Sequence, residues 1–187
     1  GTGILEEMAL HGQVPVVVST FSKTFGGIGG ILLGSEEVVE LVQHNARSFL
    51  FSASLPVPVV AAASTILDML EESGPAMVEE LHQKAKYFRT ELTTAGFDLG
   101  ASNTHIMPVM CRDERKTLFM HVALLECGVL MVPITYPAVK NGEERLRVNV
   151  TRGHSQEDMD TALGLLKSYG EAFYVLSGED LGPMEDA

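Results

Sequence analysis

The sequence contains few cysteines. Only two of its 187 residues are cysteines, Cys111 and Cys127, and neither belongs to a cluster with metal-ligand spacing. A chain of this length needs no disulfide to hold its core, unlike the short secreted domains that depend on them. The sequence therefore predicts two reduced thiols in the core, with no metal site and no disulfide scaffold.

Basic residues and long apolar runs are also scarce. Lysine and arginine total 13 against 25 aspartates and glutamates, which gives a net charge of −12. Such a chain repels phosphate backbones and anionic lipid surfaces, which argues against nucleic acid as a partner. No apolar run reaches the roughly 18 residues of a membrane span, and no secretory leader is seen. These absences favour a cytoplasmic protein without a membrane span.

Strands and helices alternate along the chain, in which 45% of the residues are hydrophobic. Apolar and β-branched runs predict strands at residues 14–19, 31–33, 105–111, 129–132 and 145–150. Helices are predicted after Ser35 and at residues 56–72, 76–95, 115–127 and 155–173. This alternation indicates an α/β fold.

Domain organisation follows from a predicted helix break at Ser73-Gly74-Pro75. We expect one domain at residues 1–72, a smaller α+β domain at 73–175, and an acidic, frayed tail at 176–187. Ser155 is followed three residues later by Asp158, which predicts a capping box at the start of the last helix.

Lys23 has the most informative setting in the chain. It follows the run Val16-Val17-Val18 and precedes the glycine-rich stretch 26–30. A lysine that carries a cofactor as a Schiff base needs a rigid support and room for the cofactor against the backbone, and this setting supplies both. An ordinary solvated lysine in a hairpin is the alternative.

Two known glycine loops do not fit this stretch. A phosphate loop of the Walker type needs glycines where Ser22 and Val17 stand. A dinucleotide fingerprint that starts at Gly27 needs a small residue where Leu32 stands, and no helix follows at once. Both motifs are therefore rejected.

Three ordered segments resemble one family, the α-oxoamine synthases, which are pyridoxal-phosphate enzymes that join an amino acid to an acyl-coenzyme A. The segments are Thr20-x-x-Lys23 with its glycines, Arg47 to Pro56, and Tyr136-Pro137-Ala138-Val139 followed by Arg145-Leu146-Arg147-Val148 and His154. The resemblance covers residues 1–175. It implies the C-terminal portion of a pyridoxal-phosphate-dependent transferase of fold type I, the aspartate aminotransferase-like fold, made of the end of the large cofactor domain and a small α+β domain.

The resemblance also implies roles for four residues. Lys23 corresponds to the lysine that carries the cofactor and moves protons at the substrate. Thr20 corresponds to a phosphate ligand, and Ser52 to a phosphate ligand that reaches the neighbouring subunit of a homodimer. Arg147 corresponds to the arginine that binds the substrate carboxylate. No Asp-x-x-His pair precedes Lys23, so we expect a C-terminal piece whose ring-binding histidine and aspartate lie elsewhere.

Each role has an alternative. Thr20 could cap a turn, Ser52 could cap the next helix, and Arg145, on the same strand face, could replace Arg147 as the carboxylate clamp. His154 is expected to cap or pack rather than to transfer protons.

The implied reaction condenses glycine, serine or alanine with an acyl-coenzyme A. Residues 95–97 and 106–110 look closest to the glycine C-acetyltransferase branch of the family, whereas residues 51–54 lean toward the serine palmitoyltransferase branch, and 8-amino-7-oxononanoate synthase is a third relative. A true aminotransferase of the same fold is the rival reaction. A noncatalytic subunit or an inactive fragment is the rival of another class.

Overall fold

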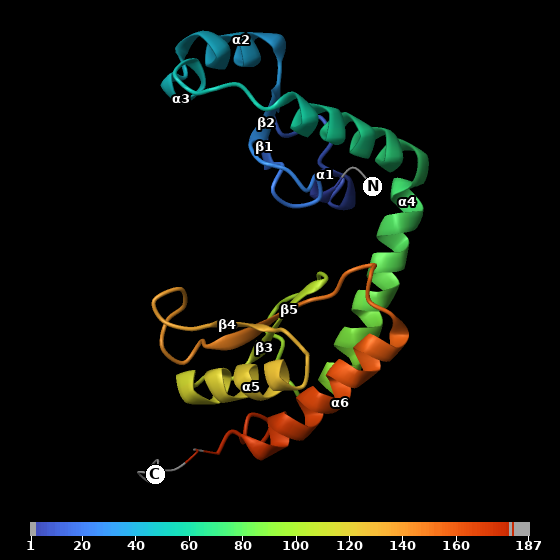
Figure 1. Ribbon diagram of the computed structural model, residues 1–187, viewed down its shortest axis with the longest axis vertical. Helices are drawn as coiled ribbons and strands as arrows, with labels where there is room; N and C mark the ends of the chain where they lie inside the picture. Colours follow the sequence, from blue (N-terminus) through green and yellow to red (C-terminus); the bar gives the residue numbers. More distant parts are fainter. Residues whose placement is uncertain (1–2, 180, 182–187) are drawn as a thin grey trace. The chain divides into compact units, whose positions relative to one another are not determined.

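The computed structural model describes residues 3–179 and 181. The chain forms two compact units, Gly1–Val78 and Glu79–Ala187, and the division lies inside one long helix, α4 (Val57–Thr94) (Figure 1). The boundary predicted after residue 72 also falls inside α4. The acidic tail predicted at 176–187 lies mostly outside the described residues.

The first unit is built on an antiparallel hairpin of β1 (Val16–Thr20) and β2 (Gly30–Gly34) (Figure 1). Val16 pairs with Gly34, and Thr20 pairs with Gly30 at the end that carries the connecting turn. The two strands predicted here are confirmed, with bounds that differ by at most two residues. The hairpin therefore places the Lys23 stretch in a turn between two paired strands.

Three further helices belong to this unit: α1 (Ile4–Glu7), α2 (Glu36–Asn45) and α3 (Arg47–Leu50). Ser35 stands at the N-cap of α2 as predicted, although its side chain does not cap the helix. A hydrogen bond from Ser35 instead lowers the pKa of the Glu37 carboxyl. The sequence does not predict α1 and α3, because a single turn is too short to show helical periodicity.

The predicted helix break at 73–75 is wrong, since α4 is one helix of 38 residues with Pro75 inside it. Proline removes one N–H from the helical ladder, and the hydrogen bonds on either side remain possible. Good helix formers lie before Ser73-Gly74, at Leu70 to Glu72, and directly after the proline, at Ala76 and Met77. One proline is therefore not enough to end the helix here.

The second unit contains an antiparallel sheet in the order β3-β5-β4, formed by β3 (Ile106–Met110), β5 (Arg145–Asn149) and β4 (Val132–Ile134). The bounds of the strand predicted at 129–132 are wrong, because β4 begins three residues later, at Val132, and ends two residues later, at Ile134. The Val129 N–H donates to the Leu124 carbonyl after Gly128 at φ 82°, which closes the end of the preceding helix. β4 therefore starts later, at the edge of the sheet, where Pro133 is tolerated.

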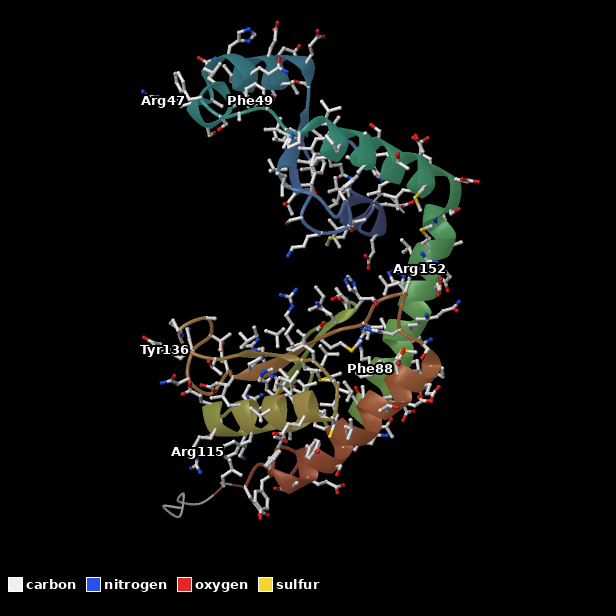
Figure 2. The ribbon with its side chains drawn as sticks, in the orientation of Figure 1. Arg47, Phe49, Phe88, Arg115, Tyr136 and Arg152 are labelled. Atoms are coloured by element: carbon white, nitrogen blue, oxygen red, sulfur yellow. The ribbon has the colours of Figure 1, made fainter. Side chains whose placement is uncertain are left out.

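Helices α5 (Glu114–Glu126) and α6 (Gln156–Ala172) and the last turns of α4 cover one face of this sheet (Figure 1). Alternate strand residues point into this layer and are buried: Met107, Val109, Leu146 and Val148. Phe88 of α4 is also buried in this core (Figure 2). The opposite face of the sheet is where Arg145 and Arg147 lie, because side chains alternate along a strand.

The two cysteines differ. Cys111 is free and buried in the core, as predicted, whereas Cys127 is free and exposed, so its predicted core position is wrong. Cys127 follows the last residue of α5, where the helix end is open to solvent, and its Sγ lies 3.2 Å from the Tyr169 hydroxyl.

No helix among residues 3–179 has both the length and the apolarity needed to cross a membrane. Within the same described part of the chain, no group of three histidine, cysteine, aspartate or glutamate side chains is arranged to hold a metal ion.

Candidate active site

Lys23 lies in a closed turn between β1 and β2. Three backbone hydrogen bonds hold this turn, from the Phe21 N–H to the Gly29 carbonyl (2.9 Å), from the Gly27 N–H to the Phe21 carbonyl (2.7 Å), and from the Gly26 N–H to the Lys23 carbonyl (2.9 Å). Phe21 is buried and meets Phe25 edge to face, with ring centroids 5.1 Å apart. The turn is therefore internally packed, while the Lys23 residue itself is exposed.

The sequence predicts that the glycines of this turn leave room for a cofactor, but most of them are needed for the turn itself or for packing against other residues of the chain. Gly29 has φ 88°, and a Cβ on Gly30 would lie 2.6 Å from the Ser19 carbonyl oxygen, so both positions need glycine. A Cβ on Gly29 would overlap Leu55, and one on Gly27 would lie 3.1 Å from Val59. The space beside these two glycines is therefore filled by protein. Beside Gly26, by contrast, it is open.

Thr20 ends β1 and directs its hydroxyl into the same turn. The Ser22 N–H donates to Thr20 Oγ1 (3.2 Å), the two hydroxyl oxygens lie 2.9 Å apart, and Thr20 Oγ1 also lies 3.3 Å from the Gly29 carbonyl, to which it can donate. In this structure the Thr20 hydroxyl therefore caps the turn, which is the alternative to a role as phosphate ligand. Ser22 was not among the predicted site residues. The signal that could have found it is the Ser/Thr turn, in which the Thr20 hydroxyl accepts the N–H of the residue two positions later, Ser22.

Ser52 follows α3 and is exposed. Its hydroxyl donates to the Ser48 carbonyl, so it satisfies an acceptor near the end of that helix. Pro56, not Ser52, directly precedes α4, and its carbonyl accepts the N–H groups of Val59 and Val60 in the first turn of that helix. The alternative that Ser52 caps α4 is therefore wrong, and its predicted role as a phosphate ligand stays a prediction.

Arg147 lies in the middle of β5, opposite Pro108 of β3 and Val132 of β4, and it is exposed. Its neighbour Arg145 donates to the Glu143 carbonyl (2.7 Å) and forms an ion pair with the Glu143 carboxylate (3.4 Å). Among the described residues, no hydrogen bond or ion pair of the Arg147 guanidinium is found. Of the two arginines, Arg147 has the guanidinium that is available for an incoming carboxylate.

The loop after β5 is tied to α4. Lys84 Nζ donates to the carbonyls of Arg152 (2.5 Å) and His154 (2.9 Å). Arg152, which is labelled in Figure 2, donates through Nε to Glu80 (2.8 Å). Arg152 and then Lys84 lower the pKa of the Glu80 carboxyl. The His154 ring accepts the Thr151 N–H (3.2 Å), a contact within the turn that follows β5. The N-cap of α6 is Ser155, so the expectation that His154 caps this last helix is wrong.

The predicted site residues are divided between the units. Thr20, Lys23 and Ser52 belong to the first unit and Arg147 to the second. An apolar cavity of about 400 Å³ opens beside the hairpin, where Val18, Leu32 and Phe49 help to line it. None of the four predicted residues lines this cavity, so it is not part of the candidate site.

Comparison with known proteins supplies the family context. The model of the family described as aminotransferase class I and II matches residues 5–166. The 8-amino-7-oxononanoate synthase of Thermoanaerobacter pseudethanolicus is 38% identical over 176 residues, which cover 94% of this chain and 44% of that protein.

Solved structures give the same result. A serine palmitoyltransferase with its pyridoxal phosphate internal aldimine has a TM-score of 0.86 at 32% identity, and the match covers 92% of this chain and 44% of that one. The serine palmitoyltransferase of Sphingomonas wittichii has a TM-score of 0.87 at 30% identity, with coverages of 94% and 44%. This chain spans about 44% of the length of these relatives. The resemblance to the α-oxoamine synthases and the expected fold are confirmed.

Proposed function

Because the chain belongs to the aminotransferase class I and II family, we propose that it supplies part of the active site of a pyridoxal-phosphate-dependent acyltransferase of the α-oxoamine synthase type. The observation that carries this proposal is the Lys23 turn, in which an exposed lysine stands beside a pair of hydroxyls on a closed, packed loop. The relatives named 8-amino-7-oxononanoate synthase and serine palmitoyltransferase support the reaction type.

The residues present fit a small phosphorylated aldehyde. Lys23 provides an exposed amine, and Thr20 provides a hydroxyl three residues away whose neighbour, Ser22, adds a second donor 2.9 Å from it. A hydroxyl that now lies near the Gly29 carbonyl can rotate to donate to a phosphate oxygen instead. In this role Lys23 holds the cofactor, and Thr20 binds its phosphate.

Arg147 is proposed to orient the amino acid. Its planar guanidinium can bind a carboxylate through two parallel hydrogen bonds, which fixes the direction of the substrate as well as its affinity. Pyridoxal phosphate, when bound, supplies the electron sink that stabilises a carbanion at the α-carbon of the amino acid. The incoming amino acid would displace Lys23 from the cofactor, and the freed Lys23 amine would take the proton from that carbon. The carbon could then attack the acyl thioester, from which coenzyme A would leave as the thiol.

A second copy of the chain is part of the proposal. Ser52 directly follows three apolar residues, Phe49 (labelled in Figure 2), Leu50 and Phe51. Their exposed fractions are 59%, 50% and 81%. Three consecutive exposed apolar side chains favour a contact with another protein surface. In a homodimer, the exposed Ser52 would reach the cofactor phosphate of the neighbouring subunit.

The substrates are proposed as a class, a small amino acid (glycine, serine or alanine) and an acyl-coenzyme A. The family model, which is that of the aminotransferases, favours one second candidate, the transfer of an amino group to a keto acid. Release of free coenzyme A that depends on both substrates separates the two reactions, because an aminotransferase does not consume a thioester.

The direct test is cofactor capture. The chain, and any longer gene product that contains it, is incubated with pyridoxal phosphate, reduced with borohydride and mapped by mass spectrometry. A pyridoxyl label on Lys23 that disappears in Lys23→Ala is expected. A label in the longer product alone would show that this chain holds only part of the site. No label on Lys23 in either protein would refute the enzyme proposal and leave a noncatalytic subunit or an inactive fragment.

A further inference from the structure

The turn that carries Lys23 is held from outside by one short segment of the chain. Leu55 lies so close to Gly29 that a Cβ on that glycine would overlap its δ-methyl group, and Val59 lies against Gly27 in the same way. Leu55 and Val59 are four residues apart, at the entrance and in the first turn of α4. Each of the two glycines thus has one apolar side chain from this segment packed against it.

Gly29 is the point at which this contact acts on the lysine. Its carbonyl accepts the Phe21 N–H (2.9 Å) and lies 3.3 Å from the Thr20 hydroxyl, so it joins the two ends of the loop that contains Lys23. A displacement of Gly29 therefore loosens both the predicted phosphate ligand Thr20 and the loop that carries the lysine.

Leu55 also stands three residues after Ser52, in the stretch between α3 and α4. The stretch that packs on the lysine turn is thus continuous with the one that carries the second predicted phosphate ligand. We infer that Leu55 is a positioning residue for Lys23, which holds the glycine turn of the lysine against the segment that carries Ser52. This inference rests on the proposed function for the roles of Lys23 and Ser52, whereas the packing contact does not depend on it.

The first test measures the turn without any cofactor. Hydrogen exchange of the Phe21, Gly26 and Gly27 amides is compared in the unaltered chain, Leu55→Ala, Leu55→Met and the control Leu41→Ala, which alters a residue 62% exposed on α2 of the same unit. In Leu55→Ala we expect these three amides to exchange at least about tenfold faster than in the unaltered chain. Removal of a packed leucine side chain leaves a space beside Gly29 and so lowers the local stability of the turn. Leu55→Met should largely restore protection, and Leu41→Ala should leave it unchanged. Equal exchange in Leu55→Ala and Leu41→Ala would overturn the inference.

The second test uses a double-mutant cycle with Gly29→Ala. Because the added methyl group overlaps the Leu55 side chain, the effects of Gly29→Ala and Leu55→Ala on exchange should be less than additive. Strictly additive effects would overturn the direct contact.

The third test connects the turn to the chemistry. In protein that traps pyridoxal phosphate, the rate of borohydride trapping on Lys23 should fall in Leu55→Ala and recover in Leu55→Met. An unchanged trapping rate in a Leu55→Ala protein with a loosened turn would overturn the positioning role. Failure of the unaltered protein to trap the cofactor would refute the proposed function, whereas the exchange comparison decides about the Leu55 contact in either case.

Discussion

At the scale of single residues, Arg145 and Arg147 differ in what their guanidinium groups already bind. Arg145 is engaged by Glu143, whereas Arg147 has no such contact among the described residues. Under the proposed function, in a protein that catalyses the reaction, we expect Arg147→Gln to raise the KM for the amino acid by roughly 10- to 150-fold, since hydrogen bonds to a charged group contribute about 1.5–3 kcal/mol. The matched variant Arg145→Gln should change it by less than about threefold. Steady-state kinetics checks this, and a larger effect at Arg145 would reassign the clamp.

The two thiols lead to a second prediction at this scale. Burial raises the pKa of the Cys111 thiol to about 11, so this group stays protonated and unreactive at pH 8. Cys127 is exposed. A thiol reagent at pH 8 should therefore titrate one cysteine in the native chain and two in denaturant, and Cys127→Ser should remove the fast reaction. Rapid labelling of Cys111 in the native chain would contradict its burial.

At the scale of elements, the start of α6 is held by a complete capping box. Ser155 accepts the Asp158 N–H (3.1 Å), and the Asp158 carboxylate accepts the Ser155 N–H (2.9 Å) and hydroxyl (2.7 Å). The Ser155 hydroxyl, followed by its N–H, lowers the pKa of the Asp158 carboxyl. The sequence predicts this element because both members of the box lie within four residues.

Removal of the cap should be visible in stability. Ser155→Ala is expected to lower the free energy of unfolding by about 1 kcal/mol at neutral pH, as measured by urea denaturation. A carboxyl whose pKa is lowered by folding stabilises above its unfolded pKa of about 3.9 and loses this contribution as the pH falls through its folded pKa. The difference between the two proteins should therefore shrink below about pH 3.9. Ser168→Ala, an exposed position on the same helix, is the control and should not be destabilising. An equal loss in both variants would rule out capping as the cause.

At the scale of the whole molecule, the core is unevenly distributed. All members of the large buried cluster lie between Ala85 and Leu166. Among the described residues of the first unit, only Phe21 and Ala63 belong to the buried hydrophobic set, and a two-stranded hairpin by itself is marginally stable. The two units should therefore differ in local stability.

Hydrogen exchange of the full chain checks this difference. The amides of β1 and β2 should exchange at least about tenfold faster than those of β3 and β5, because far less apolar surface is buried around the hairpin. Equal protection of the two sets of amides that persists on dilution would contradict this expectation. Protection of the hairpin that is lost on dilution would come from a second copy of the chain, because a contact between copies weakens as the concentration falls.

Local signals in the sequence determined much of this protein. The hairpin strands, the capping box at Ser155, the alternation that places Arg145 and Arg147 on one strand face, and the setting of Lys23 all depend on residues close together in the chain. The bounds of β4 and the α4 break were predicted wrongly, because local rules give propensities and the actual hydrogen bonds decide where an element ends. The implied roles of Thr20, Lys23, Ser52 and Arg147 came from the family resemblance.

Only the tertiary structure decided which side chains meet across the fold. It showed that Leu55 and Val59 fill the space beside Gly29 and Gly27, that Glu143 engages Arg145 and leaves Arg147 open, and that Cys127 is exposed while Cys111 is buried. These facts depend on packing between segments or on the direction of a side chain, whereas sequence spacing reports only neighbours along one strand or helix. The sequence therefore predicted a role for the lysine turn, and the packing of the chain revealed which side chains lie against that turn.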